Sequence, residues 1–168
     1  MNITLINQAQ RYYISQKEAD LLCSYILRSE AKNPGPPVKA FFTKVKPAKC
    51  ELSLTLCDDP YIQKINNAYL NRNRPTDVIS FSQIEGEHAD LNPETLGDII
   101  ISVDTARRQA SEYGHSIKKE LILLITHGVL HVLGYEHEMD HPYKKEMLER
   151  QERYSKMFYE RLMKGVKK

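Results

Sequence analysis

Three histidines lie close together in the sequence HGVLHVLGYEH, residues 127–137, which we call the histidine motif. His127 and His131 are four residues apart and follow an apolar run, a pattern that favours a helix. Because a helix has about 3.6 residues per turn, both imidazoles would lie on one helix face. Gly134 can adopt a positive φ, so it would end the helix and turn His137 back toward the pair. Three imidazoles with one open position are the ligand set of catalytic zinc, so we predict a metal site.

The residues beside these histidines narrow the chemistry that the site could perform. Zinc peptidases carry a glutamate directly after the first histidine as general base, and here that position is Gly128. Peptide hydrolysis is therefore disfavoured. Glu136, directly before the third histidine, is our candidate general base, and a hydroxide bound to the metal is the alternative. A zinc ion that only braced the fold would have a fourth protein ligand, so the open position favours catalysis.

Two further histidines are alternative ligands. His115 adjoins Gly114 at the start of the helix that leads into the motif, where a capping or packing role is the better explanation. His141 follows His137 by four residues and precedes Pro142, and it remains a reserve ligand. The three histidines of the motif therefore remain the predicted ligand set.

The bulk properties of the chain are those of an ordinary globular protein. It has 168 residues, 41% of them hydrophobic and 27% charged, and we predict a single domain over residues 1–168. No apolar run approaches the roughly 20 residues of a membrane helix, and the N-terminus lacks a signal pattern. We therefore expect a cytoplasmic protein without membrane contacts. Its three cysteines form no CxxC pair, and a net charge of +2 does not by itself indicate nucleic-acid binding.

Hydrophobic periodicity indicates an α/β (α+β) fold with a mixed sheet of about four strands that carries helices. Ser15 and Glu18 form a capping box at the start of the first helix. Two β-rich runs, 38–45 and 51–56, suggest a hairpin. The predicted strands cover residues 2–7, 38–45, 51–56, 77–82 and 97–103, and the predicted helices cover residues 16–31, 61–71, 104–113, 116–133 and 142–163.

The histidine motif and two upstream blocks resemble the YbeY family of bacterial ribosomal-RNA maturation factors. The upstream blocks are RPTDVISFS (Arg74–Ser82) and LGDIIISVDTARRQA (Leu96–Ala110), and their order and spacing agree with the family over roughly residues 60–140. The resemblance implies a mixed sheet with a motif helix like that of the zinc peptidases. It also implies a single-strand-specific, metal-dependent endoribonuclease that acts in the 3′-end maturation of small-subunit ribosomal RNA and in ribosome biogenesis.

This resemblance also defines the expected cofactor and partners. The cofactor would be one zinc ion, Zn2+, on His127, His131 and His137, and the substrate would be single-stranded or ribosomal RNA. The small ribosomal subunit or its assembly proteins are expected partners. The alternative function is a non-catalytic ribosome-assembly factor in which zinc braces the C-terminal half of the chain.

The chain departs from the family at two positions that matter for catalysis. Glu136 stands where the family usually has aspartate, and Leu70 stands where it usually has an arginine. Leucine cannot donate hydrogen bonds to a phosphate or offset its charge, whereas an arginine fork does both. Arg72 could reach the same space if the preceding helix frays, whereas Arg74 adjoins Pro75, which favours an extended backbone. We therefore predict that Arg72 is the substitute.

The segment Pro75–Val78 has two interpretations. Pro75, Thr76 and Asp77 are common turn residues whose side chains bond to nearby backbone. Alternatively, the segment forms an edge beside the cleft that holds a substrate strand, and Asp77 orients a metal-bound histidine.

Overall fold

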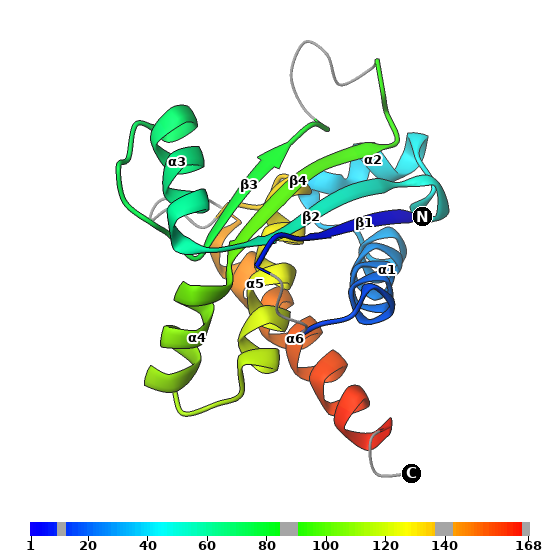
Figure 1. The fold of residues 1–168 in the computed structure, drawn as a ribbon. Coiled ribbons are helices and arrows are strands. Elements are labelled where there is room, and N and C mark those ends of the chain that lie inside the picture. The colour runs from blue at the N-terminus through cyan, green and yellow to red at the C-terminus, as the bar shows by residue number, and fades with distance from the viewer. Residues whose placement is uncertain (10–12, 85–90, 137–142, 166–168) are drawn as a thin grey trace.

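Four strands form one sheet in the order β1-β2-β4-β3, in a computed structural model that describes residues 1–9, 13–84, 91–136 and 143–165 (Figure 1). The strands β1 (Asn2–Asn7), β2 (Glu51–Cys57) and β4 (Thr95–Ser102) run parallel. The edge strand β3 (Val78–Ser82) pairs antiparallel with β4. The predicted mixed sheet of about four strands is therefore confirmed.

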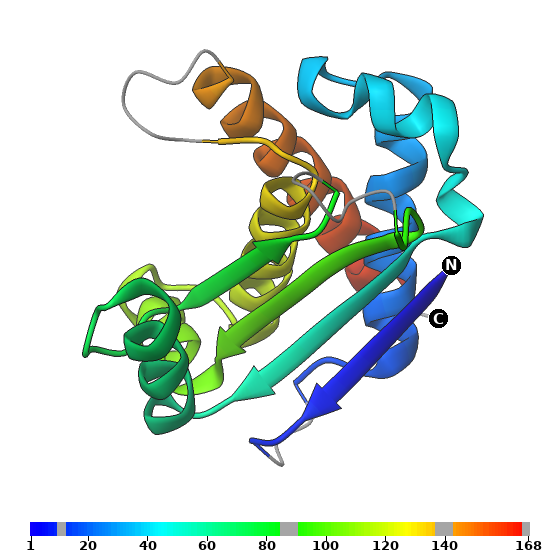
Figure 2. The same cartoon turned by 90° about the horizontal axis from the view of Figure 1, so that it is seen from above.

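Helices cover both faces of this sheet. They are α1 (Gln16–Lys32), α2 (Lys39–Lys44), α3 (Asp59–Leu70), α4 (Val103–Glu112), α5 (Ile117–Val132) and α6 (Lys144–Gly165). The helices α1 and α5 lie against one face with α6 packed beyond α5, and α3 lies on the opposite face (Figures 1 and 2). In the described part of the chain, no helix is long and apolar enough to cross a membrane.

The main core lies between the sheet and α5. Alternate residues of the central strands point to this side, including Leu54 of β2 and Ile99 of β4, which are fully buried. The helix α5 is itself apolar on most of its surface, as expected for a helix that is buried in a core. A smaller cluster of Cys57, Ile62 and Ile79 attaches α3 to the opposite face of the sheet. The helix that carries two motif histidines is thus the best-anchored helix of the fold.

Most predicted elements are present close to their predicted bounds. The first strand occupies the predicted residues 2–7, and the capping box of α1 forms as predicted, because the Glu18 amide donates to Ser15 Oγ and the Ser15 amide donates to Glu18 Oε2. The predicted segment 116–133 is α5, Ile117–Val132, with Ser116 as its N-cap.

The predicted strand at residues 38–45 is wrong. This segment is the short helix α2, preceded by a 3-10 turn at Pro36–Val38 that begins with two prolines. A hairpin with β2 is excluded by topology, because both edges of β2 are already occupied by β1 and β4. The apolar residues Val38, Phe41 and Val45 are also spaced as on a helix, and this spacing outweighs the β-rich composition.

Candidate active site beside the edge strand

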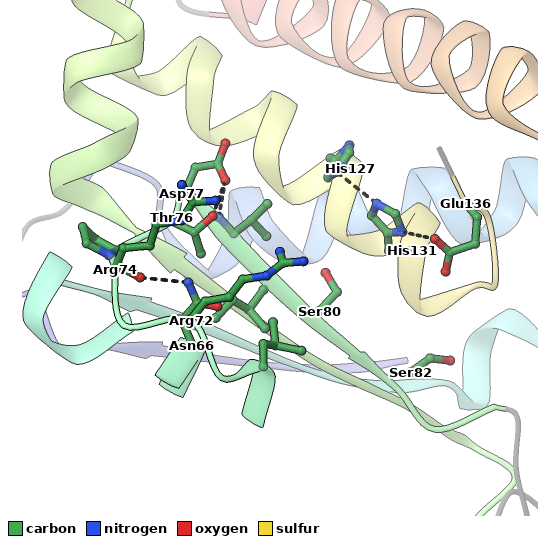
Figure 3. A pocket seen from close by; sticks show the side chains of 14 residues that line it. Asn66, Arg72, Arg74, Thr76, Asp77, Ser80, Ser82, His127, His131 and Glu136 are labelled. Carbon is green, nitrogen blue, oxygen red and sulfur yellow. Dashed lines mark hydrogen bonds and ion pairs between the residues drawn. The ribbon is translucent and has the colours of Figure 1, made fainter. Parts of the chain in front are cut away.

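A cleft of about 830 Å³ lies between α5 and the edge strand β3. The end of α3 and the loop that follows it form a third wall, and the C-terminal end of the histidine motif contributes a fourth (Figure 3). The sequence-predicted residues found in the lining are Leu70, Arg72, Arg74, Asp77, His127, His131 and Glu136. The fold thus brings together residues from three separate blocks of the sequence.

His127 and His131 face each other at this cleft. Their Nε2 atoms are 3.0 Å apart, and the rings meet edge to face with centroids 4.5 Å apart (Figure 3). A zinc ion bonds imidazole nitrogen at about 2.0–2.1 Å, which places two tetrahedral ligands roughly 3.3 Å from each other. The observed separation is within a few tenths of an ångström of that value, so the pair fits two adjacent ligands of one ion.

The other candidate ligands lie elsewhere. His137 and His141 fall outside the described residues. Among the residues that the structure describes, no group of three His, Cys, Asp or Glu side chains forms a complete metal site. The assignment of His137 as the third ligand therefore stays a prediction.

His115 is held away from the cleft by a partner of its own. Its Nε2 atom lies 3.1 Å from Glu120 Oε2, and its ring stacks on Tyr113. Burial raises the pKa of the Glu120 carboxyl, the charge of His115 opposes this, and Asp77 raises the pKa further. The packing role predicted for His115 is therefore confirmed.

Gly134 ends the helix of the motif with a left-handed turn, as predicted. Its φ is 86°, a conformation that favours glycine. The Gly134 amide donates to the His131 carbonyl at 2.9 Å, and the Tyr135 amide donates to the Leu130 carbonyl at 3.0 Å. This pair of bonds is a Schellman motif, which redirects the chain immediately after the second histidine.

The residue after this turn is anchored in the core. Tyr135 is fully buried, and its hydroxyl donates to Glu30 Oε2 at 2.7 Å. Burial, together with the hydrogen bond to Glu30, raises the pKa of Tyr135 well above its usual range. Glu30 also pairs with Arg150 of α6 at 2.8 Å and accepts from Tyr154. The end of the motif is thereby attached to both α1 and α6.

We expect Gly134→Val to weaken metal binding although no ligand is removed. A β-branched residue strongly disfavours positive φ, so the turn would open and displace everything after it. The loss is measured as the zinc dissociation constant of the purified variant, with Gly114→Ala as control. Gly114 also has positive φ, but no atom lies within 4 Å of a β-carbon built there, and it is outside the cleft. Wild-type affinity in Gly134→Val would contradict the proposed role of the turn.

The position of the peptidase base cannot carry a side chain. A β-carbon at Gly128 would lie 2.7 Å from Ile99 Cγ2, because α5 approaches β4 closely at this point. A larger residue would have to displace the Ile99 side chain or move the helix away from the sheet. Its packing therefore explains why glycine occupies the position, and it excludes a glutamate base there.

Glu136 lies at the mouth of the cleft. Its side chain is half-exposed, and its Oε2 atom is 3.8 Å from His131 Nδ1, which is longer than a hydrogen bond (Figure 3). The structure therefore places this candidate base beside the histidine pair and in contact with solvent.

The two candidate arginines are placed by the end of α3. This helix ends at Asn71 in a left-handed conformation with φ 55°, so it does not fray. The Arg72 amide then donates to the Asn66 carbonyl at 3.2 Å, and Asn66 Nδ2 donates to the Arg74 carbonyl at 2.8 Å. As a result the Arg72 side chain extends along the cleft toward Ser80, on the side of the histidines, while Arg74 lies at the far end (Figure 3).

The hydrogen bonds of Asp77 are those expected of a turn residue, the first of its two interpretations. Its carboxylate accepts from the Val78 amide at 2.8 Å, from Thr76 Oγ1 at 3.1 Å and from Gln109 Nε2 at 2.9 Å. These bonds fix the start of β3. Among the described residues, none of these hydrogen bonds is made to a histidine.

The outer edge of β3 borders the cleft. The Ser102 amide donates to the Asp77 carbonyl, and the Gln83 amide donates to the Leu96 carbonyl, so odd-numbered residues pair with β4. Antiparallel pairing alternates, so the backbone groups of Ser80 and its even-numbered neighbours point to the open edge. This edge offers amide donors and carbonyl acceptors beside Arg72, as the sequence interpretation of a substrate-binding edge requires.

The sequence analysis missed one residue at the site. Gln151 of α6 lies with its Oε1 atom 2.9 Å from His127 Nδ1. The available signal was a polar residue on the apolar stripe of α6, between the buried Met147 and Phe158. That signal identifies an inward-facing amide, but only the packing of α6 on α5 shows which residue it meets.

The sheet and its cleft define a mixed α/β protein with a paired-imidazole site at the open edge of the sheet. The family model described as Endoribonuclease YbeY matches residues 6–159, so the chain belongs to the YbeY family.

Individual relatives agree with this assignment. A protein of Syntrophus aciditrophicus named Endoribonuclease YbeY is 51% identical over 102 residues, 61% of this chain and 64% of that protein. One of Syntrophotalea carbinolica with the same name is 56% identical over 88 residues, 52% of this chain and 59% of that protein. The matches thus span about three fifths of the length of these relatives. The solution structure of TM1509 from Thermotoga maritima, 20% identical, matches with a TM-score of 0.59 over 97% of this chain and 93% of that chain. It shares the fold.

Proposed function

We propose that the protein is a zinc-dependent, single-strand-specific endoribonuclease that acts in ribosomal-RNA processing and ribosome biogenesis, including 3′-end maturation of the small-subunit RNA. The observation that carries the proposal is the pair of Nε2 atoms, 3.0 Å apart, in a cleft that also contains Arg72 and an open strand edge. The name of the relatives, Endoribonuclease YbeY, supports the choice of RNA as substrate.

In this proposal His127, His131 and His137 hold the ion. A divalent metal supplies Lewis-acid stabilisation of phosphate charge and lowers the pKa of water near it. The guanidinium of Arg72 binds the phosphodiester in the cleft and offsets its charge with a fork of donors. The open edge of β3 positions the adjoining sugar and base through the backbone groups of Ser80. Glu136, at the mouth of the cleft, accepts the proton of the nucleophile, which is either a water molecule or a ribose 2′-hydroxyl of the RNA.

The proposal extends to the rest of the chain. We assign residues 1–168 to one YbeY-like domain, and the small ribosomal subunit with its assembly proteins is the proposed setting of the reaction. Action on ribosomal RNA would place the protein in the cytoplasm.

A non-catalytic ribosome-assembly role is the second candidate. The observation that favours it is Leu70, an apolar residue that lines the cleft where the family usually has arginine. In that case zinc would brace the C-terminal half, and RNA would bind without being cut.

Metal analysis combined with a cleavage assay separates these functions. The purified protein is analysed for zinc and incubated with a labelled single-stranded RNA, with chelator, and with chelator followed by added zinc. The same RNA annealed to its complement is the substrate control. We expect cleavage of the single strand only, lost with chelator and restored by zinc. Zinc at full stoichiometry without any cleavage would instead support the assembly factor.

A further inference from the structure

The amide of Gln151 reaches the histidine pair from a different helix. Its Oε1 atom lies 2.9 Å from His127 Nδ1, on the side of the ring away from the cleft. The helix α6 packs along α5, so this contact joins the C-terminal helix to the site (Figure 1). We propose that Gln151 is a positioning residue that holds His127 in the tautomer with its proton on Nδ1. The proposal rests on the zinc site of the proposed function.

The direction of the hydrogen bond decides the tautomer. An amide oxygen only accepts, so the imidazole Nδ1 must donate and carry the proton. In a neutral ring the Nε2 atom then carries the lone pair, and this atom faces His131 Nε2 at 3.0 Å. A histidine bound to a metal almost always donates its other ring N–H to such an acceptor, which fixes both the tautomer and the ring plane.

This tautomer also fixes the roles of the two rings within the pair. The two Nε2 atoms are 3.0 Å apart, so one proton between them would satisfy both in the absence of an ion. That proton would have to be displaced before an ion could bind. Gln151 decides which ring carries that proton, because it holds the proton of His127 on Nδ1 and leaves its Nε2 as the acceptor toward His131.

The described outer contact of His131 is longer. Its Nδ1 atom faces Glu136 Oε2 at 3.8 Å, beyond hydrogen-bond distance, and that carboxylate is half-exposed. The amide of Gln151 therefore makes the shorter of these two outer contacts. It holds the His127 ring by a contact of hydrogen-bond length.

The position of Gln151 is itself fixed by its neighbours on α6. Arg150 forms the buried pair with Glu30 at 2.8 Å, which sets the register of the helix against α1. Ser155 Oγ donates to the Gln151 carbonyl at 2.7 Å. The helix that carries Gln151 is thus anchored by the same buried Glu30 network that anchors Tyr135.

Two substitutions at Gln151 test the proposal in the full-length protein. Gln151→Leu keeps a similar volume but removes the acceptor, and Gln151→Glu keeps an acceptor. Glu152→Leu, on the next residue of α6 with an exposed side chain, is the matched control for adding a leucine to this helix. Two readouts are needed: the tautomer of His127 in the zinc-free protein, from the nitrogen-15 shifts of its ring, and the zinc dissociation constant by competition with a chelating dye.

In the wild-type apoprotein we expect His127 to carry its proton on Nδ1. Gln151→Leu should lose this tautomer preference and bind zinc about 10–100-fold more weakly, the usual cost of losing an outer partner. Gln151→Glu should keep the tautomer and bind zinc at least as tightly as wild type, and Glu152→Leu should leave both readouts unchanged.

The proposal is overturned if the wild-type ring carries its proton on Nε2, or if Gln151→Leu changes neither tautomer nor zinc affinity. The proposal is also overturned if Gln151→Glu loses as much zinc affinity as Gln151→Leu. A packing defect, and not the loss of the acceptor, would then be responsible. Both readouts are independent of RNA. A protein that shows them and does not cleave RNA would refute the nuclease and leave this inference intact.

Discussion

Replacing His131 by alanine should remove bound zinc and RNA cleavage together and leave the protein folded. The imidazole is one of the two nitrogens that face each other at 3.0 Å, so its loss takes away half of the pair. The cost should exceed the roughly 10–100-fold that the loss of an outer partner costs a metal site. Folding should persist, because the His131 side chain lies at the cleft while its neighbours Leu130 and Val132 fill the core.

The measurement is zinc content per chain alongside cleavage of single-stranded RNA, with circular dichroism to confirm the helix content. His115→Ala is the control, since it removes a histidine from the same region that pairs with Glu120 away from the cleft. It should retain both zinc and activity. Zinc at full stoichiometry in His131→Ala would refute the three-histidine assignment.

Local sequence patterns were sufficient for the part of the site that lies on one helix. The spacing of His127 and His131 on an apolar run predicts their shared face, and Gly134 predicts the turn, because both depend only on neighbours within a few residues. The structure confirms the helix, the shared face and the turn.

Contacts between distant segments could not be predicted in the same way. The apolar stripe of α6 marks Gln151 as facing inward, but Gln151 meets His127 only because α6 lies along α5, and no local rule specifies that partner. The predicted strand at residues 38–45 was wrong for a related reason. Its β-rich composition suggested a strand, but the sheet has no free edge beside β2 for it to occupy.

The last prediction concerns the arginine that the family usually has and this chain lacks. Leu70 lines the cleft at that position, and a leucine cannot bind phosphate. Arg72 was predicted as the substitute through fraying of α3. The structure gives its side chain the predicted direction through a left-handed turn at Asn71 (Figure 3). The helix does not need to fray for the guanidinium to reach the cleft.

We expect Arg72→Ala to slow RNA cleavage at least about tenfold, equivalent to about 1.4 kcal/mol, with zinc content unchanged. Losing a fork of donors that binds a phosphate lowers the rate of cleavage strongly, and Arg72 extends toward the histidine pair. Single-turnover cleavage of labelled RNA measures the effect. Arg72→Lys separates charge from geometry, because an ammonium keeps the charge but cannot form the bidentate contact.

Arg74→Ala is the matched control, because Arg74 lines the same cleft and carries the same charge but lies at its far end. It should weaken RNA binding through a general loss of positive charge, which high salt would mask, and change the cleavage step little. If Arg74→Ala instead produces the tenfold loss and Arg72→Ala does not, the phosphate binds at the opposite end of the cleft. If neither variant slows cleavage, phosphate recognition does not depend on this loop. In that case the phosphate is bound through the lysines of the chain, whereas a wild-type protein that does not cleave RNA at all would favour the assembly-factor function.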